Sequence, residues 1–513
     1  MSALTSLRLL VRKMSTEEKK VARNFLTAFS IRGAGAPNQA LKLFDLLCRE
    51  TKGEAELDDS QIESLIYSRK SGTAFPRLIL RLKDKLFESL LLSVNLERPN
   101  AYSERGRALH EIRKGISQAQ ILQDRGVWDS VLIILNECIE KAAKYEHYEE
   151  WAAALRVQME MKTVDRGKSI FETENRQYEK VIKCLLASKK ALEYYHQLGS
   201  EIQFKAASVS LEALEKQIKE LQTDLEQTGS ANVAYFLHYL ETHYYQEKRQ
   251  FKAATVTLKQ QAELVEFHPA LHSPSRLAGV FINLAWNEIY TRHFAGALRY
   301  AERVEKLIPE KHFNLFQCYE TCFYAYFYTG KYEKALDKIN TLLKQDSSST
   351  AEYRIGKREY QKACVLFILE KYDQVHKILL DLNPIENDHE GWNIGLRVLH
   401  IMNDIELEKT ENAFNRIENM RKHIDKLKKG NRENPRDVLK YEILRTLVNT
   451  RFDFMETRKK KKQELDKLSS NDSIYSWRIL SPELIVFNQW VESKVFKQNL
   501  VLKTPAYNEP ALT

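Results

Sequence analysis

The sequence predicts an all-α protein in which antiparallel helical hairpins stack into a superhelix behind an N-terminal helical domain. The chain of 513 residues contains only 17 Gly and 11 Pro, about half the usual frequency of each. Strand turns and long loops need these two residues, so their scarcity favours helix nearly throughout. Apolar residues recur at helical spacing, and one short motif recurs at intervals of about 40 residues, which predicts repeated hairpins.

The length of the chain requires more than one compact core. A single hydrophobic core stops growing at roughly 250–300 residues, so a longer chain splits into domains or repeats a smaller unit. Breaks in the helical pattern predict four segments. These are an N-terminal helical domain (1–100), helical repeats (101–427), a C-terminal helical cap with a basic patch (428–502) and a flexible tail (503–513).

Residues 1–100 have the pattern of a compact helical unit. Ser15 and Glu18 have the spacing of a capping box, which predicts a helix over Thr16–Ser30. The other predicted helices of this unit are Ala40–Arg49, a segment with its N-cap at Asp59, and Phe75–Leu96. The last helix carries a leucine stripe, which is typical of a packing element. A helix pair that reads DNA is the alternative, and it would need polar base-reading residues on that helix.

The recurring motif is an aromatic residue followed three positions later by a small one. It falls where one predicted helix ends and the next begins, and successive small residues from Ala254 to Ala413 lie 38 to 43 positions apart. The copies are Trp128 with Val131, Phe251 with Ala254, Phe294 with Ala297, Tyr332 with Ala335, Tyr372 with Val375, and a degenerate copy at Ala413. This periodicity predicts one helical hairpin per repeat.

The clearest copy, Phe323–Leu336, resembles the core of a tetratricopeptide repeat. In that resemblance Gly330 adopts the left-handed backbone that ends the first helix. Tyr332 is the aromatic wedge between helices, and Ala335 is the small residue at their crossing. The preceding unit ends at Pro309, in the helix-ending position. The family period is about 34 residues, so the repeats of this chain are longer, and we expect longer helices.

The resemblance is good over Ala231–Leu427 and weaker over Glu111–Leu221. It does not extend to residues 1–100. That N-terminal unit followed by divergent repeats is similar to uncharacterised helical-repeat proteins of the Bacteroidota, a resemblance that implies no particular function.

The predicted array should present a concave face for a partner. A hairpin cannot bury its apolar face alone, so neighbours stack and the stack curves. In tetratricopeptide arrays the first helix of each pair lines the concave face. Aligned on the small residues, that face comprises Tyr239, His243, Trp286, Tyr290, Glu320, Tyr324, Phe327, Tyr328, Tyr360 and Phe367. Aromatic side chains are enriched at binding hot spots, although a stripe at helical spacing also fits core packing.

The positive charge of the chain is concentrated in one region. Residues 421–462 hold 15 Lys and Arg against 6 Asp and Glu, which matches the net charge of +9 for the whole chain. The densest run is a basic patch of Arg458, Lys459, Lys460, Lys461 and Lys462. Such a region can attract nucleic acid or acidic partners, and a solvated helix end is the plainer interpretation.

No motif in the sequence indicates catalysis. Walker, Rossmann, zinc-protease and nucleophile-elbow motifs are absent, so we expect a protein that is not an enzyme and has no catalytic residues and no cofactor. Cys318 and Cys322 stand at i, i+4, a spacing that can place two thiolates on a metal. No second ligand pair follows, so the sequence favours core packing of small apolar groups and no metal site.

Together these patterns predict a scaffold or adaptor that binds a protein or peptide on the concave face of an α-solenoid. A nucleic-acid-associated or regulatory protein that uses region 421–462 is the alternative. No apolar run approaches the length of a membrane span, so we expect no membrane partner and a cytoplasmic location. The sequence does not indicate an oligomeric state.

Overall fold

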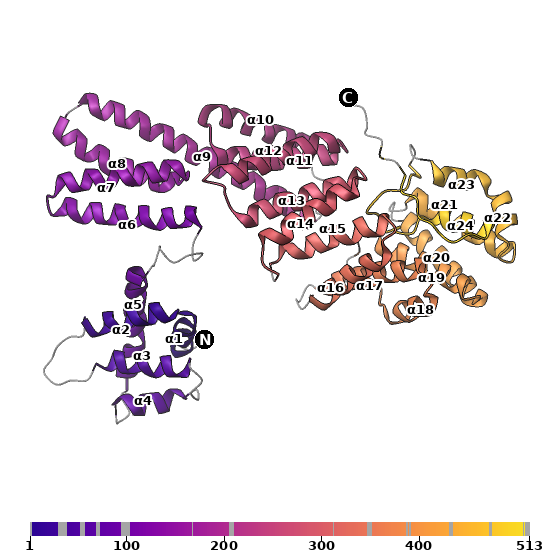
Figure 1. The fold of residues 1–513 in the computed structure, drawn as a ribbon, viewed down its shortest axis with the longest axis horizontal. Helices are drawn as coiled ribbons and strands as arrows, with labels where there is room; N and C mark the ends of the chain where they lie inside the picture. Colours follow the sequence, from indigo (N-terminus) through magenta and orange to yellow (C-terminus); the bar gives the residue numbers. More distant parts are fainter. Residues whose placement is uncertain are drawn as a thin grey trace. The chain divides into compact units, whose positions relative to one another are not determined.

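The computed structural model describes residues 3–28, 38–51, 57–67, 72–93, 103–166, 168–204, 210–310, 312–345, 351–385, 388, 391–429, 434–470, 474–505 and 507. These residues form 24 α-helices and no β-strand, which confirms the predicted all-α fold. Helices that follow one another along the chain pack side by side through most of the repeat region (Figure 1). No helix in the described ranges is both long enough and apolar enough to cross a membrane.

The chain divides into two compact units, Met1–His110 and Glu111–Thr513. The division falls within α6 (Glu104–Asp124), ten residues after the boundary that the sequence pattern suggested. The predicted repeats and the predicted C-terminal cap belong to the same unit.

The first unit contains five helices around one apolar core. They are α1 (Ala3–Lys13), α2 (Thr16–Ala28), α3 (Gln39–Glu50), α4 (Asp59–Tyr67) and α5 (Ala74–Ser93). Leu7, Leu43, Phe44 and Leu82 are fully buried in this core. The leucine stripe of α5 therefore packs inward, as expected for a packing domain.

Two helix starts in this unit show the capping chemistry directly. The Ser15 N–H donates to Glu18 at 2.6 Å and the Glu18 N–H donates to the Ser15 hydroxyl at 3.2 Å, which confirms the capping box. The prediction for α4 was wrong by one residue, because Asp58 is its cap. The Gln61 N–H donates to the Asp58 carboxylate at 2.8 Å, and Asp59 is the first helical residue.

The second unit begins with helices that match the repeat pattern loosely. They are α6, α7 (Trp128–Lys144), α8 (Tyr148–Arg166), α9 (Lys168–Phe204) and α10 (Leu211–Thr228). At 37 residues, α9 is more than twice the length of a repeat helix such as α12. Its length explains why the tetratricopeptide resemblance weakens over this part of the chain.

The regular part of the array consists of five hairpins from α11 to α20. Within each hairpin the two helices pack against each other, and each hairpin packs against the next (Figure 1). The hairpins are α11 (Ala231–Glu247) with α12 (Phe251–Phe267), α13 (Pro274–Tyr290) with α14 (Phe294–Leu307), α15 (Asn314–Tyr328) with α16 (Tyr332–Gln345), α17 (Ala351–Ile368) with α18 (Tyr372–Asp381), and α19 (Trp392–Glu406) with α20 (Thr410–Lys429).

The repeated motif occupies the same structural position in each hairpin. Its aromatic residue is the first residue of α7, α12, α14, α16 and α18. Its small residue is completely buried, as at Ala254, Ala297, Ala335 and Val375. The number of sequence positions between successive small residues follows helix length. Helices α12 and α13 have 17 residues each, whereas α14 and α15 have 14 and 15. The long period therefore comes partly from longer helices, as the sequence predicted.

The turn inside each hairpin has one residue with left-handed backbone, two positions before the first residue of the second helix. Gly330 has φ +74°, which confirms its predicted role. Only two of the six equivalent positions hold glycine, and the left-handed backbone costs other residues roughly 1–2 kcal/mol. The six are Gly126, between α6 and α7, and, in the five hairpins, Arg249, Arg292, Gly330, Glu370 and Glu408.

A carboxylate caps one helix of the array from far away in the sequence. Glu146 lies in the turn between α7 and α8, and its side chain accepts from the N–H groups of Ala231 at 2.7 Å and Asn232 at 2.9 Å. These groups belong to the first turn of α11, whose free donors and positive dipole end favour an anion. The contact ties the irregular start of the unit to its regular hairpins.

The described residues after the array form a cap that contains four helices. They are α21 (Pro435–Asn449), α22 (Phe454–Lys460), α23 (Lys462–Ser469) and α24 (Phe487–Phe496). Between α23 and α24, residues 474–486 have no helix and lie against the hairpin array. We call residues 474–486 the return segment.

A buried charge cluster fixes the return segment in the cap. The Arg436 guanidinium donates to both Glu483 oxygens at 2.7 Å and to the carbonyl oxygens of Leu468 and Tyr475. Lys440 lies 3.1 Å from the same carboxylate. Burial acts to raise the pKa of Glu483, but Lys440 and Arg436 overcome it and lower the pKa to about 2.

Candidate functional site

The ten side chains predicted to form the concave face come from the first helices of four hairpins: α11, α13, α15 and α17. The structure separates them into two groups. Half-buried side chains are Tyr239, His243, Trp286, Tyr290 and Glu320, and buried side chains are Tyr324, Phe327, Tyr328, Tyr360 and Phe367.

The buried group belongs to the largest hydrophobic core of the chain. Phe327 has no exposed surface, and Tyr324 retains only 2%. The Tyr324 hydroxyl accepts from the side chain of Gln361 at 2.8 Å, so even its polar end is satisfied within the protein. Neighbouring residues on α15 point to different sides of the helix, and Phe327 is one that points into the core. These five side chains offer no free surface to a partner in this conformation.

The return segment covers part of the buried group through two tyrosine hydroxyls. The Leu480 N–H donates to the Tyr328 hydroxyl at 3.4 Å, and the Tyr360 hydroxyl donates to the Pro482 carbonyl at 2.6 Å. Trp477 meets the Tyr328 ring edge-on at 5.8 Å between centroids. The face therefore holds a non-helical chain, which turns at Arg478–Ser481, by its backbone.

A glycine in α19 makes this close approach possible. A Cβ at Gly395 would lie 2.5 Å from the Pro482 carbonyl oxygen and 2.6 Å from the Tyr360 hydroxyl. No side chain fits at such distances, because neither neighbour is the free end of a flexible group. Sequence reasoning missed the contact because Pro482 lies 122 positions from Tyr360 and belongs to no periodic pattern.

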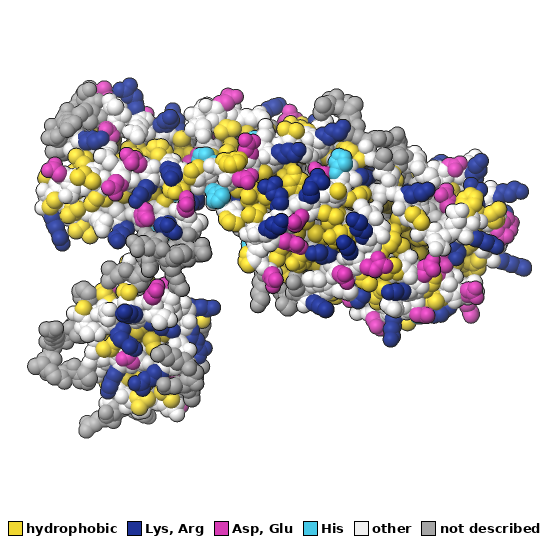
Figure 2. All heavy atoms as spheres, viewed as in Figure 1, with side chains coloured by type: hydrophobic (Ala, Val, Ile, Leu, Met, Phe, Trp, Pro, Cys, Tyr) yellow, Lys and Arg dark blue, Asp and Glu magenta, His cyan; other side chains and the backbone are white. Residues whose placement is uncertain are grey.

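The half-buried group continues the same face beyond the return segment. Tyr239 and His243 meet edge-on at 4.5 Å between ring centroids. Trp286 approaches the Tyr324 ring at 5.7 Å, and Tyr290 stacks on Phe251 at 4.6 Å. Figure 2 shows hydrophobic side chains gathered among Lys and Arg over the middle of the second unit. We call Tyr239, His243, Trp286 and Tyr290 the open aromatic group.

Two titratable groups on this part of the face, His243 and Glu320, carry no free charge. Burial lowers the pKa of His243 to about 4, so its imidazole is neutral near pH 7. Glu320 forms a 2.7 Å ion pair with Lys357 of α17, which joins two neighbouring hairpins. The open aromatic group therefore presents neutral rings, and the adjacent carboxylate is already paired.

The C-terminal tail is not free at Tyr507. Its hydroxyl donates to the Arg249 carbonyl at 2.6 Å and its ring meets Phe251 edge-on at 5.5 Å. The Arg292 guanidinium lies 5.6 Å from the same ring and donates to the Pro505 carbonyl at 3.3 Å. In the predicted flexible tail (503–513), Tyr507 therefore contacts the array, while residues 506 and 508–513 lie outside the described residues. Flexibility of the tail stays a prediction.

The basic patch Arg458–Lys462 spans two helices. It includes the last turn of α22 and the first residue of α23, with Lys461 between them. Four of its side chains are exposed and Lys461 is half-buried. Lys460 and Lys461 pair with nearby glutamates, and Arg458 lies 5.2 Å from the Phe496 ring. Elsewhere in region 421–462, Arg436 and Lys440 are buried and paired with Glu483.

Two further features could hold a small ligand or an ion. A cavity of about 300 Å³ between α18, α19 and α20 is lined by polar groups that include Arg397, His400 and Arg416. Among the residues whose positions are described, one group of cysteine and acidic side chains has metal-ligand spacing. It consists of Glu305, Cys318 and Cys322.

Comparisons with known proteins give limited information. No family model and no curated protein matches the chain. Among solved structures it is similar to a signal transduction ATPase with numerous domains (STAND), which has a tetratricopeptide repeat sensor, from Pyrococcus horikoshii. The identity is 12%, the TM-score is 0.37, and the match covers 79% of this chain and 62% of that protein. We draw no functional argument from it. The resemblance to Bacteroidota proteins stays a prediction.

Proposed function

We propose that this chain is a non-catalytic scaffold or adaptor that binds a non-helical segment of a partner protein on the concave face of its hairpin array. One observation carries the proposal: the face already holds a non-helical chain, the return segment, through the Tyr328 and Tyr360 hydroxyls. Hydroxyl contacts to backbone N–H and carbonyl groups suit a peptide of any sequence.

The open aromatic group supplies contact area for such a peptide, next to the return segment. Tyr and Trp offer large contact area and lose little conformational entropy on binding. The hairpins hold these rings on packed helices, so a partner pays little for ordering them. Because His243 is neutral and Glu320 is paired, the chemistry favours a peptide with apolar or aromatic side chains.

Nucleic-acid binding at region 421–462 is the alternative, supported by the exposure of Lys459, Lys460 and Lys462. Phosphate contacts weaken steeply as salt rises, because binding releases counterions. Aromatic and backbone contacts respond weakly to salt. The two functions therefore separate by ionic strength and nuclease treatment. Absence of catalysis and a cytoplasmic location remain predictions of the sequence.

The test compares proteins captured from the native host by wild type and by Trp286→Ala, at low and high salt and after nuclease treatment. Truncating a true hot spot costs at least about 2 kcal/mol, roughly thirty-fold in affinity. We expect a captured partner to be retained by wild type at both salt concentrations and lost by Trp286→Ala.

Trp128→Ala is the matched control, because Trp128 is an exposed tryptophan on α7, outside the proposed face. It should capture the partner as wild type does. Each variant must keep the wild-type melting temperature, since a core aromatic would also destabilise the fold when truncated. Capture that survives Trp286→Ala but fails after nuclease treatment, or on changing Lys459–Lys462 to Gln, would favour the nucleic-acid function.

A further inference from the structure

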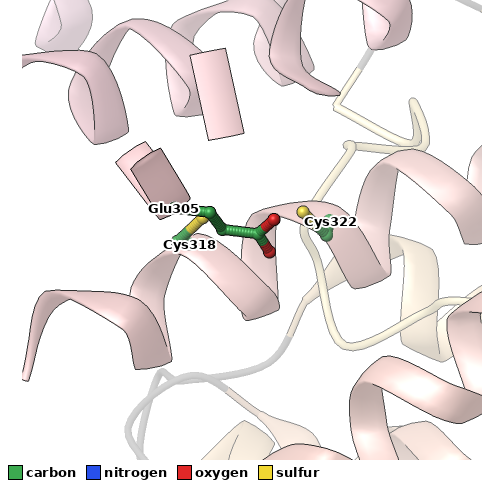
Figure 3. A group of neighbouring side chains, drawn as sticks. All are labelled: Glu305, Cys318 and Cys322. Carbon is green, nitrogen blue, oxygen red and sulfur yellow. The ribbon is translucent and has the colours of Figure 1, made fainter. Parts of the chain in front are cut away.

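Two cysteines and a glutamate meet at the junction of two neighbouring hairpins. Cys318 and Cys322 lie one turn apart on α15, and Glu305 lies in the last turn of α14. One ligand atom from each residue lies within 4.8 Å of the others. Figure 3 shows the Glu305 side chain extended along α15, with its carboxylate directed toward Cys322.

We propose that Glu305, Cys318 and Cys322 form a binding site for a thiophilic divalent cation of the Zn²⁺ class. Zn²⁺ binds thiolate sulfur at about 2.3 Å and carboxylate oxygen at about 2.0–2.2 Å, so tetrahedral donors lie about 3.5–3.8 Å apart. The observed separations are all within 4.8 Å, so the three side chains would have to move closer to hold the ion. Two thiolates with one carboxylate suit Zn²⁺ better than the hard cations Mg²⁺ and Ca²⁺.

The charges around the cluster also fit a dication. Two thiolates and a carboxylate carry three negative charges, and the Lys338 ammonium lies 2.9 Å from Oε1 of Glu305. A bound Zn²⁺ would bring the total of these four side chains and the metal to zero. Since Lys338 occupies one carboxylate oxygen, the other oxygen remains for the metal. Lys338 also lies 4.3 Å from the Tyr319 ring, which helps to hold it in place.

The Cys318 thiol also contacts α14, the helix that carries Glu305. It donates weakly to the Ala301 carbonyl at 3.4 Å. Binding of Zn²⁺ would displace the protons of both thiols, because the thiolate is the form that binds a metal.

The position of the site indicates what the metal would do. Cys318 and Cys322 are buried, whereas Glu305 is exposed, so the site lies at the protein surface with its sulfur atoms inward. Three protein ligands leave a fourth position for water or for a donor atom from another molecule. A metal here would link α14 to α15 and would stabilise the stacking of the second regular hairpin on the third.

Titration of the reduced full-length chain with Co²⁺ tests the proposal, because cobalt bound by thiolate absorbs through charge transfer from sulfur. We expect one equivalent of Co²⁺ to produce these bands and Zn²⁺ to abolish them by displacement. The double variant Cys318→Ala/Cys322→Ala should show no bands. Glu305→Gln should bind at least roughly tenfold more weakly, since even outer partners of metal sites contribute 10–100-fold to affinity.

Cys48→Ala is the matched control, because Cys48 is a buried cysteine in the first unit, and it should retain the full signal. A second readout uses only wild type: Zn²⁺ should raise the melting temperature, and a chelator should reverse the rise. Co²⁺ binding without sulfur bands, or bands that persist in the double variant, would overturn the proposal. The two cysteines would then be packing groups, as the sequence alone suggested. Partner capture by the open aromatic group does not depend on either result.

Discussion

The hairpin array from α11 to α20 and the cap from α21 to α24 are stabilised in different ways. In the array, four of the five hairpins repeat the same contact, an aromatic residue at a helix start and a completely buried small residue three positions later, and the fifth keeps the buried small residue Ala413. In the cap, one cluster of Arg436, Lys440 and Glu483 joins α21 to the return segment, and Arg436 also donates to the Leu468 carbonyl of α23. The array spreads its stabilisation over many similar apolar contacts, whereas the cap concentrates it in one buried ionic group.

This difference predicts unequal responses to single substitutions. Stability in a repeat array is close to a sum of units and their interfaces, so a change at one interface has a limited effect. A buried ion pair behaves otherwise, because removing one partner leaves an uncompensated charge away from water. The following predictions test that contrast, in order of decreasing expected effect.

Glu483→Gln should have the largest effect. It leaves the buried Arg436 charge without its carboxylate, which typically costs about 3–5 kcal/mol, whereas Lys440 keeps its ion pair with Asp437. We expect loss of the cap at lower urea than in wild type, measured by fluorescence of Trp477 and Trp490. Glu456→Gln, at an exposed ion pair of α22, should change stability by no more than about 0.5 kcal/mol. Equal effects of the two variants would contradict the distinction between array and cap.

The same cluster predicts a pH dependence for wild type. The folded pKa of Glu483 is lowered to about 2 from an ordinary value of 4.5. Its contribution to stability is therefore complete above about pH 4.5 and is lost as the pH falls toward 2. The Glu483→Gln variant should lack this component of the acid transition.

Ala335→Leu should have an intermediate effect on the array. Ala335 is completely buried, and the sequence pattern predicts that it lies where two helices cross. The larger side chain of leucine should overpack this position and destabilise the protein by about 1–3 kcal/mol. Thermal unfolding followed by circular dichroism measures the change. Ala295→Leu is the control, because Ala295 is exposed on the neighbouring α14. If both variants melt like wild type, the small residues of the motif are not crossing points.

Glu370→Gly should have the smallest effect and the opposite sign. Glu370 is exposed in a hairpin turn with φ +58°, a backbone that glycine adopts without strain. Glycine relieves the backbone strain of the folded state, but it also makes the unfolded chain more flexible, which offsets part of the gain. The net effect should raise stability by about 0.5–1 kcal/mol. The reverse change, Gly330→Ala, should destabilise the equivalent turn. Melting temperatures that move in the same direction would contradict a shared turn geometry.

The candidate face could be predicted only in part. Alignment on the small residues identified the first helix of each hairpin correctly, and Trp286 and Tyr290 remain half-buried there. Periodicity could not separate them from Tyr324 and Phe327, because burial depends on how neighbouring hairpins and the return segment close over each ring. The contact of Tyr507 with Arg249 was missed for a similar reason, since the two residues lie 258 positions apart.

By itself, the sequence determined the all-α class, the hairpin period, the positions of the buried small residues and the left-handed turn at Gly330. These features depend on residues within one or two helical turns of each other, so local pattern specifies them. Only the tertiary structure decided where Glu146, Glu305 and Glu483 act, because each meets its partners across a sequence gap that no helical period encodes. Carboxylates look alike in a sequence, and only folding distinguishes a helix cap, a possible metal ligand and a buried ion pair from a solvated surface charge.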